Sequence, residues 1–271
     1  MFFDSHCHLT FPQLASQIQD ILQRCKDAQV TRLLNIGDDI ESSRIAHTQI
    51  PLAAEYGITM RATAGVHPQK ALEFDFEKTP AILRRLAGDE NTVAIGELGL
   101  DYVYDDSHEQ YPGASRPHQQ KVMRTQLDLA QELGLSVVIH NREADDDLLA
   151  VVADYPGLRG VFHCFGSSPE VAEKVLSMGF HLGFTGIVTF KNAGVVREVA
   201  QLCPLDRMLI ETDSPYLAPV PYRGKTNEPG FVPFVARTIA EVRGKTIEEI
   251  AEQTTNNARL LFGLNASTGD A

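Results

Sequence analysis

The sequence predicts an α/β protein built as a closed (β/α)8 TIM barrel, and three observations support this prediction. Short apolar segments of strand length alternate with longer segments that have helical periodicity. About eight such alternations occur, which predicts a parallel sheet covered by helices. The length of 271 residues also matches the roughly 250 residues of a typical barrel. An open doubly wound sheet is the second choice, but the GxGxxG fingerprint of dinucleotide-binding sheets is absent.

The predicted strands are short runs rich in apolar residues. In chain order they are Phe2–His6, Arg32–Ile36, Met60–Val66, Thr92–Glu97, Leu135–His140, Gly160–His163, Phe180–Phe184 and Arg207–Glu211. Two of the intervening helices have clear boundaries. The segment HQQKVMRTQLDLAQELG repeats apolar residues near the helical spacing and ends at Gly134. The segment SSPEVAEKVLSMG begins at a capping Ser168, has Pro169 in the first helical position and ends at Gly179.

Composition predicts one domain, residues 1–265, followed by a flexible tail, residues 266–271. No linker, repeat or low-complexity run precedes the final NASTGDA. No run approaches the ~18 apolar residues of a membrane span, and MFFDSHCH lacks the basic and long apolar regions of a signal peptide. The cysteines are scattered without a CxxC pair, which indicates reduced thiols. We therefore expect a cytoplasmic protein that does not interact with membranes.

The formal net charge of −12 bears on the possible partners. Proteins that bind nucleic acids usually present a basic surface, because phosphate neutralisation supplies much of the affinity. The charge balance therefore argues against extended electrostatic contact with a polyanion. We favour the simpler interpretation that these carboxylates form the solvated surface of an ordinary globular protein.

Ionisable residues gather at the ends of the predicted strands. In a barrel the carboxyl ends of all strands meet at one mouth, where active sites lie. Because side chains alternate along a strand, the two histidines of DSHCH can face the same side while Cys7 faces away. Each residue alone is more simply explained as a core histidine or a capping carboxylate, but their joint placement indicates a site. The set is His6, His8, His67, Glu97, His140, His163, Glu211 and Asp213.

These residue types predict a centre for two divalent metal ions. A carboxylate such as Glu97 has two oxygens and can bridge two cations. His140 and His163 would hold the second ion, and Asp213 would complete the first site near a water molecule that the ions activate. A histidine-rich set favours Zn, Mn or Co over Mg, which prefers oxygen ligands. The residues alone do not determine which ion each ligand binds.

Seven motifs, taken in order, resemble those of one family across the chain from Phe3 to Phe262. They are DSHCHL, GVHP, GELGLDY, VVIHNRE, HCFG, ETDSPYLAP and RGKTNEP. This series is similar to that of the TatD family of metal-dependent deoxyribonucleases, which are amidohydrolase-like TIM barrels. The HxH motif alone would be a weak signal, whereas seven motifs in order are specific.

The resemblance implies a role for each ligand. The opening HxH motif binds one metal, the glutamate of GELGLD bridges both, and the IH and HCF histidines bind the second. The aspartate of ETDSP binds the first metal and serves as base. The corresponding residues are His6, His8, Glu97, His140, His163 and Asp213, of which Glu97 and Asp213 are the predicted catalytic pair.

Further residues lie just beyond strand ends and are predicted to assist. We expect His67 to bind a substrate phosphate or to support the ligands. Arg142, Arg223 and Lys225 are expected to contact phosphates, with surface solvation as the alternative for each. Glu211 is expected to support neighbouring ligands, and a buried pairing with an arginine is the alternative.

One segment departs from the family pattern. DYVYDDSHEQYPGASRPHQQ is longer and more acidic than expected, and it places Asp105, Asp106 and Glu109 near the predicted mouth. Such a loop would narrow the route of a polyanion and hinder a duplex. It favours a single-stranded end that threads toward the metals.

The ligand set and the resemblance together predict a metal-dependent deoxyribonuclease. DNA would be the substrate, hydrolysed from single-stranded ends in the 3′-to-5′ direction by a water that two divalent ions (Zn, Mn, Co or Mg) activate. The alternative is an ester or amide hydrolase with the same site, such as a D-aminoacyl-tRNA deacylase, because carbonyl and phosphoryl centres both need an activated water. A metal-binding scaffold with a degenerate site is the weakest interpretation, since a suitable residue fills every ligand position.

Overall fold

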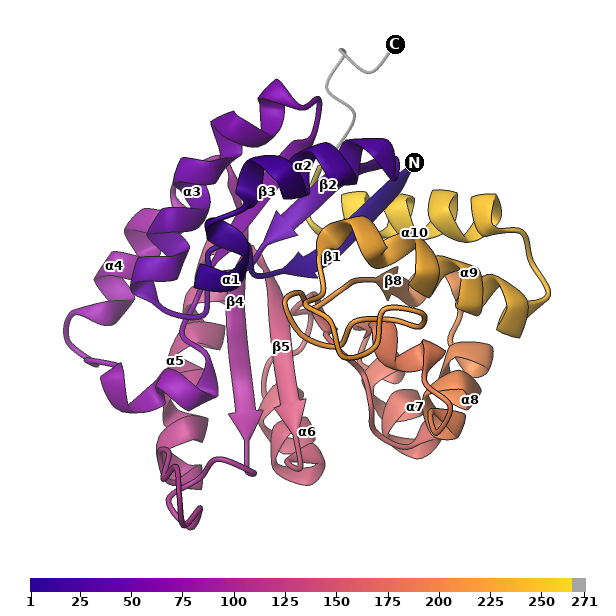
Figure 1. The fold of residues 1–271 in the computed structure, drawn as a ribbon. Coiled ribbons are helices and arrows are strands. Elements are labelled where there is room, and N and C mark those ends of the chain that lie inside the picture. Colours follow the sequence, from indigo (N-terminus) through magenta and orange to yellow (C-terminus); the bar gives the residue numbers. More distant parts are fainter. Residues whose placement is uncertain (265–271) are drawn as a thin grey trace.

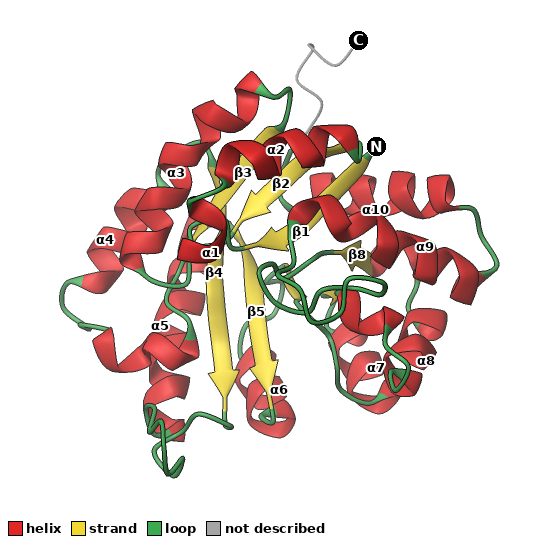
Figure 2. Ribbon diagram, viewed as in Figure 1, coloured by secondary structure: helices red, strands yellow, loops and turns green. Residues whose placement is uncertain are grey.

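The computed structural model describes residues 1–264 and confirms the barrel. Its parallel sheet has the strand order β1-β2-β3-β4-β5-β6-β7-β8, with helices packed around it (Figures 1 and 2). The strands are β1 Phe2–Cys7, β2 Val30–Asn35, β3 Thr59–Ala64, β4 Thr92–Asp101, β5 Ser136–Arg142, β6 Gly160–Phe162, β7 His181–Phe184 and β8 Met208–Ile210. The predicted end of the domain at residue 265 and the predicted tail 266–271 lie outside the described residues.

The helices follow the strands in the expected alternation. They are α1 Pro12–Ala15, α2 Ile18–Asp27, α3 Ile40–Glu55, α4 Thr79–Ala87, α5 Arg116–Leu133, α6 Asp145–Ala153, α7 Pro169–Ser177, α8 Gly194–Leu202, α9 Val232–Arg243 and α10 Ile247–Leu261. Short 3-10 helices are η1 Pro68–Glu73, η2 Gly186–Thr189, η3 Leu205–Arg207 and η4 Pro229–Phe231. Gly134 ends α5 in the left-handed conformation, and the Ser168 side chain caps α7, both as predicted. Within the described residues, no helix has the length and apolar character needed to cross a membrane.

The barrel closes at the carboxyl ends of the strands, where β1 meets the segment that follows β8. The Asp213 N–H donates to the carbonyl of His6 at 2.9 Å, and the His8 N–H donates to the carbonyl of Ser214 at 2.9 Å. These bonds place Asp213 directly beside the two histidines of the first strand. At the other end α10 packs against the barrel, and Asn257 donates to the carbonyls of Leu205 and Met208 at 2.8 Å each.

The interior and exterior of the sheet form two buried clusters. The first joins Phe3, Val138 and Leu209 from the strands to Phe262 beyond α10. The second and larger cluster lies between the strands and the surrounding helices. Cys7 belongs to this larger cluster and donates its thiol hydrogen to the carbonyl of Leu34, so it points away from His6 and His8 as expected.

The longest strand, β4, continues beyond its predicted end at Glu97. It remains paired with β5 as far as Asp101 opposite Arg142. Gly99 permits this pairing because a Cβ there would lie 2.0 Å from the carbonyl oxygen of His140, and its φ is +147°. The extension places both Glu97 and His140 within a continuous, rigid pair of strands.

Candidate metal centre

A cavity of about 630 Å³ opens at the carboxyl ends of the strands. It is lined by residues from most strand ends and from the loops that follow β4, β7 and β8. His6 does not line it, because this side chain is fully buried with its ring stacked on that of His163 at 3.9 Å between centroids. The lining residues used below are His8, Phe11, Asp38, His67, Glu97, Tyr104, His140, Arg142, His163, Asp213 and Tyr216. Five of the six predicted ligands therefore line one cavity, and the sixth, His6, lies directly beneath it against Glu97 and His163.

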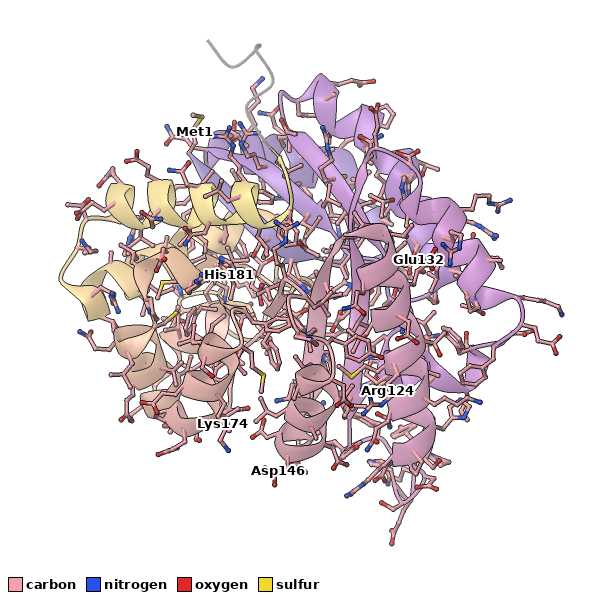
Figure 3. The ribbon with its side chains drawn as sticks, turned by 180° about the vertical axis from the view of Figure 1, so that it is seen from behind. Met1, Arg124, Glu132, Asp146, Lys174 and His181 are labelled. Atoms are coloured by element: carbon pink, nitrogen blue, oxygen red, sulfur yellow. The ribbon has the colours of Figure 1, made fainter. Side chains whose placement is uncertain are left out.

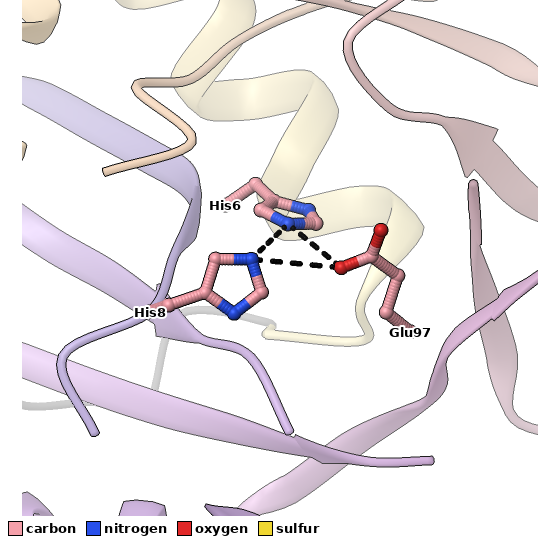
Figure 4. Close-up of side chains that lie close together, drawn as sticks. All are labelled: His6, His8 and Glu97. Atoms are coloured by element: carbon pink, nitrogen blue, oxygen red, sulfur yellow. Dashed lines mark hydrogen bonds and ion pairs between the residues drawn. The ribbon is translucent and has the colours of Figure 1, made fainter. Parts of the chain in front are cut away.

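The first group of donor atoms belongs to His6, His8, Glu97 and Asp213. The Nε2 atoms of His6 and His8 lie 3.1 Å apart, and Glu97 Oε2 lies 3.3 Å from the former and 3.5 Å from the latter (Figure 4). Asp213 Oδ1 completes the group at 3.6 Å from His6 Nε2 and 3.5 Å from His8 Nε2. Asp213 has a φ of +54°, a conformation that few residues other than glycine adopt without strain.

The second group meets the other oxygen of Glu97. Glu97 Oε1 lies 2.8 Å from His163 Nε2 and 2.9 Å from His140 Nδ1. The two imidazole nitrogens are themselves 3.2 Å apart. One buried carboxylate thus directs its two oxygens to two different pairs of histidines.

These distances fit a metal shell. Ligands about 2.0–2.1 Å from a tetrahedral ion lie about 3.3 Å from one another. In the first group the two histidine Nε2 atoms are 3.1 Å apart, and each lies 3.3 to 3.6 Å from the carboxylate oxygens of Glu97 and Asp213. Clusters of such atoms within 4.8 Å of one another include His6, His8 and Glu97, and also His6, His163 and Asp213. Mutual hydrogen bonding cannot account for this crowding, because each Nε2 of the HxH pair faces another imidazole and two carboxylates at once.

Two carboxylates orient the histidines of the second group from behind. Asp101 Oδ2 lies 3.5 Å from His140 Nε2, and Glu211 Oε1 lies 3.6 Å from His163 Nδ1. In each ring the opposite nitrogen is left to face Glu97, the arrangement that carboxylates impose on metal-binding histidines. Asp101 was not assigned a role from sequence, although it stands inside the motif GELGLDY.

Glu211 has no arginine among its partners in the described chain. Besides His163, it accepts hydrogen bonds from the Cys164 N–H at 2.6 Å and the Ser5 hydroxyl at 3.3 Å. The predicted support of neighbouring ligands is therefore compatible with its position, and the predicted alternative, a pairing with arginine, is wrong.

His67 differs from the other histidines in its hydrogen bonding. Its Nδ1 accepts a bond from the Gln69 N–H at 3.1 Å, so the proton of the neutral ring is on Nε2. That Nε2 lies 3.4 Å from Glu97 Oε1 at the edge of the cavity. Burial lowers the pKa of His67, which favours this neutral form. In this tautomer His67 can donate from Nε2 to a substrate oxygen, and its donor atoms also lie close enough to those of Glu97 and His140 to form a candidate metal group.

The carboxylates of the centre are ionised and ready to bind cations. Burial alone would raise the pKa of Glu97, but the imidazoles of His163, His67 and His6 outweigh it and hold the pKa well below its usual value. For Asp213, burial is likewise outweighed by the hydrogen bond from His8 and by the other imidazoles, so its pKa is lowered. The pKa of His163 is raised well above its usual value, because Glu97 and Glu211 outweigh its burial.

The three predicted phosphate-binding cations are placed differently. Arg142 lines the cavity, with its guanidinium carbon 5.5 Å from the ring centroid of Tyr104. Arg223 lies 3.6 Å over the ring of Phe190, and it is exposed, as is Lys225. Neither Arg223 nor Lys225 lines the cavity, so only Arg142 is in direct reach of a molecule bound there.

The acidic loop differs from the sequence expectation at Asp105. This side chain is 2% exposed and accepts hydrogen bonds from Ser107 and Arg116, which lower its pKa to about 2. Its charge is paired within the loop and not directed at the mouth, whereas Asp106 and Glu109 are exposed. Tyr104 from the same segment lines the cavity instead. The expected repulsion of a polyanion at the mouth therefore depends on Asp106 and Glu109 alone, without Asp105.

Sequence reasoning missed several residues of the cavity. Asp38 follows β2 in the sequence NIGDD and lines the cavity, so the strand-end argument applied to β2 would have found it. Phe11 and Tyr216 also line it. Tyr216 lies inside the motif ETDSPYLAP, three residues after Asp213, so the motif could have identified it. No local pattern marks Phe11, because only the closure of the barrel brings its loop beside that of Tyr216.

Comparisons with known proteins place the chain in a family of metal-dependent hydrolases. The family model described as TatD related DNase matches residues 3–263. An uncharacterized metal-dependent hydrolase, YabD of Bacillus subtilis, is 40% identical over 98% of this chain and 100% of its own length. A protein named 3'-5' ssDNA/RNA exonuclease TatD, from Erwinia billingiae, is 40% identical over 97% of this chain and 100% of its own. The crystal structure of YJJV, a TatD homologue from Escherichia coli, superposes with a TM-score of 0.84 at 30% identity, covering 97% of this chain and 98% of that one.

Proposed function

Because the chain belongs to the TatD family of metal-dependent hydrolases, we propose that it is a 3′-to-5′ exonuclease that removes nucleotides from single-stranded DNA. The proposal concerns the substrate, the direction and the number of metals. The family membership and the barrel make the protein a hydrolase. The names of the exonuclease relatives support a nucleic acid substrate.

The observation that best supports a two-metal site is that the two oxygens of the Glu97 carboxylate contact different histidines. One oxygen meets His6 and His8, and the other meets His140 and His163. We infer that Glu97 would help to hold two divalent ions, one together with His6, His8 and Asp213 and the other together with His140 and His163. The nitrogen-rich donor set favours Zn, Mn or Co, while Mg fits less well.

The chain's own groups then divide the chemistry. When bound, the two ions act as Lewis acids and lower the pKa of a water molecule. Asp213 is ionised and its side chain is 14% exposed to the cavity, so it can accept the proton of the attacking water. The Nε2–H of His67 is placed to donate to a phosphoryl oxygen, and Arg142 is placed to contact a neighbouring phosphate. As the water oxygen bonds to phosphorus, the bond from phosphorus to the 3′ oxygen of the shortened strand breaks, and this oxygen would take up the proton that Asp213 had accepted, so that a 3′-hydroxyl is left.

A single strand suits the cavity better than a duplex. The chain has a net charge of −12. Arg142 is the only lysine or arginine among the described residues that line the cavity, so the cavity does not form a continuous basic groove. Duplex binding depends on many phosphate contacts. A frayed or single-stranded 3′ end needs only to enter a cavity of about 630 Å³.

The test compares DNA and RNA oligonucleotides labelled at the 5′ end, in single-stranded and duplex forms, with protein loaded separately with Mn, Zn, Co or Mg. We expect a ladder that shortens from the 3′ end of single strands, and two equivalents of metal by elemental analysis. Absence of nucleotide release with all four metals, together with deacylation of D-aminoacyl-tRNA, would establish the alternative hydrolase instead. A 5′-to-3′ ladder would contradict the proposed direction.

A further inference from the structure

Aromatic rings form a continuous surface from the metal centre to the rim of the cavity. The ring of Phe11 stacks on His8 at 4.8 Å between centroids with 24° between the planes. Tyr216 meets Phe11 edge to face at 6.0 Å. Phe11 and Tyr216 come from the loops after β1 and β8, and both line the cavity.

Tyr216 is an exposed ring on a firmly held backbone. Its residue exposure is 52%, so packing within the protein does not explain it. Its N–H donates to the carbonyl of Asp213 at 2.9 Å, and its carbonyl accepts from the side chain of Asn227 at 2.6 Å. Asn227 is itself fully buried and donates to the carbonyl of Thr212 at 2.8 Å. The backbone that carries the exposed ring is therefore held in place, which reduces the entropy lost when a ligand stacks on the ring.

The charges around the cavity leave little electrostatic attraction for a polyanion. Arg142 is the single lysine or arginine among the described lining residues, while Asp38, Glu97 and Asp213 are acidic. Bound metal ions would offset these carboxylates near the scissile bond only. Binding of a nucleic acid end must then draw on interactions other than phosphate neutralisation. Base stacking on aromatic rings is such an interaction, and it tolerates every base because each has a π-face.

We propose that Phe11 and Tyr216 form a clamp for a base at the 3′ end of a single strand: the base stacks on one ring and meets the other, which stands at 78° to the first, edge to face. This contact positions the terminal phosphodiester over the metal centre. This inference rests on the proposed function for the identity of the strand and adds the means by which it is recognised. A base paired in a duplex is already stacked on both faces, so the clamp selects unpaired ends. It also predicts little preference among bases and poor recognition of an end without bases.

The test measures equilibrium binding of single-stranded oligonucleotides that have a hydrolysis-resistant linkage at the 3′ end. One oligonucleotide is unmodified, and the other lacks the bases of its last two nucleotides. We expect the abasic oligonucleotide to bind the wild-type protein about tenfold more weakly, the scale of one stacked base. Tyr216→Ala and Phe11→Ala should weaken binding of the unmodified strand by a similar factor, with no further loss on the abasic strand. Tyr216→Phe should retain binding within about twofold because the ring remains.

A matched control is Tyr111→Ala, which removes a 68% exposed tyrosine that does not line the cavity. Its binding should equal that of the wild type. Equal affinity of the wild-type protein for the two oligonucleotides, or equal losses on both strands in Tyr216→Ala, would overturn the clamp. Turnover of ordinary single strands is measured in parallel. If turnover is absent while the binding pattern holds, the proposed nuclease activity fails and the clamp stands.

Discussion

The substitution Glu97→Gln tests the proposed bridging role of this carboxylate most directly. The amide is nearly isosteric, but its nitrogen has no lone pair to offer a metal ion. Glu97 Oε1 lies 2.8 Å from His163 and Oε2 lies 3.3 Å from His6, so either orientation of the amide disables one of the two ligand groups. We expect the metal content to fall from two equivalents to one or fewer.

The expected effect on rate follows from this loss. Removing one preorganised electrostatic group from an active site typically lowers kcat by about 10²–10³. Glu97 contributes a full charge to two groups at once, so we expect a loss of at least about 10³. This factor corresponds to about 4 kcal/mol in activation free energy.

The assay is release of nucleotides from a single-stranded oligonucleotide, with metal content measured on the same samples. The matched control is Glu132→Gln, on the outer surface of α5 (Figure 3). It also removes one negative charge, but from an ion pair with Arg84. The control should bind two metals and retain full turnover. Two equivalents of metal and a rate within tenfold of wild type in Glu97→Gln would refute the bridging role.

Further predictions concern the framework of the site. Gly99→Ala should lower the free energy of unfolding by about 2 kcal/mol or more and reduce metal content, because its Cβ would displace the carbonyl of His140, whereas Gly194→Ala, with open space at its Cβ, should do neither. Asn227→Ala should lower the free energy of unfolding by about 3 kcal/mol, because the substitution leaves the carbonyl groups of Thr212 and Tyr216 without their hydrogen-bond donor. Denaturant unfolding measures this change, and a value under about 0.5 kcal/mol would contradict the prediction. Burial lowers the pKa of His181 to about 4 in the folded protein, whereas its pKa in the unfolded chain is near 6.5. As the pH falls, His181 is therefore protonated in the unfolded chain before it is protonated in the folded protein, which favours unfolding. Stability should then decrease by about 2 kcal/mol between pH 7 and pH 5, and His181→Gln should show less of this decrease in urea titrations at each pH.

Much of the fold and of the ligand set was predictable because both depend on local patterns. Strand and helix periodicities determine where each element begins, and a parallel barrel places every strand end at one mouth. His6, His8, His140 and His163 could therefore be grouped without coordinates. Asp38 obeys the same rule and was overlooked, while the extension of β4 depended on Gly99, whose close approach to β5 is a tertiary contact.

The sequence by itself determined the order of the elements, the residue types at the mouth and the family resemblance. Only the tertiary structure decided how the side chains are oriented there. The Gln69 N–H selects the tautomer of His67, and Arg116 withdraws Asp105 from the mouth. Asn227 fixes the backbone under Tyr216. The bond of Gln69 to His67 is local, because it caps the start of η1, but what the His67 ring faces depends on the position of Glu97 in β4. The contacts of Arg116 with Asp105 and of Asn227 with Tyr216 join residues eleven positions apart. Local periodicity does not encode such pairings, because they depend on how loops and helices pack at the barrel mouth.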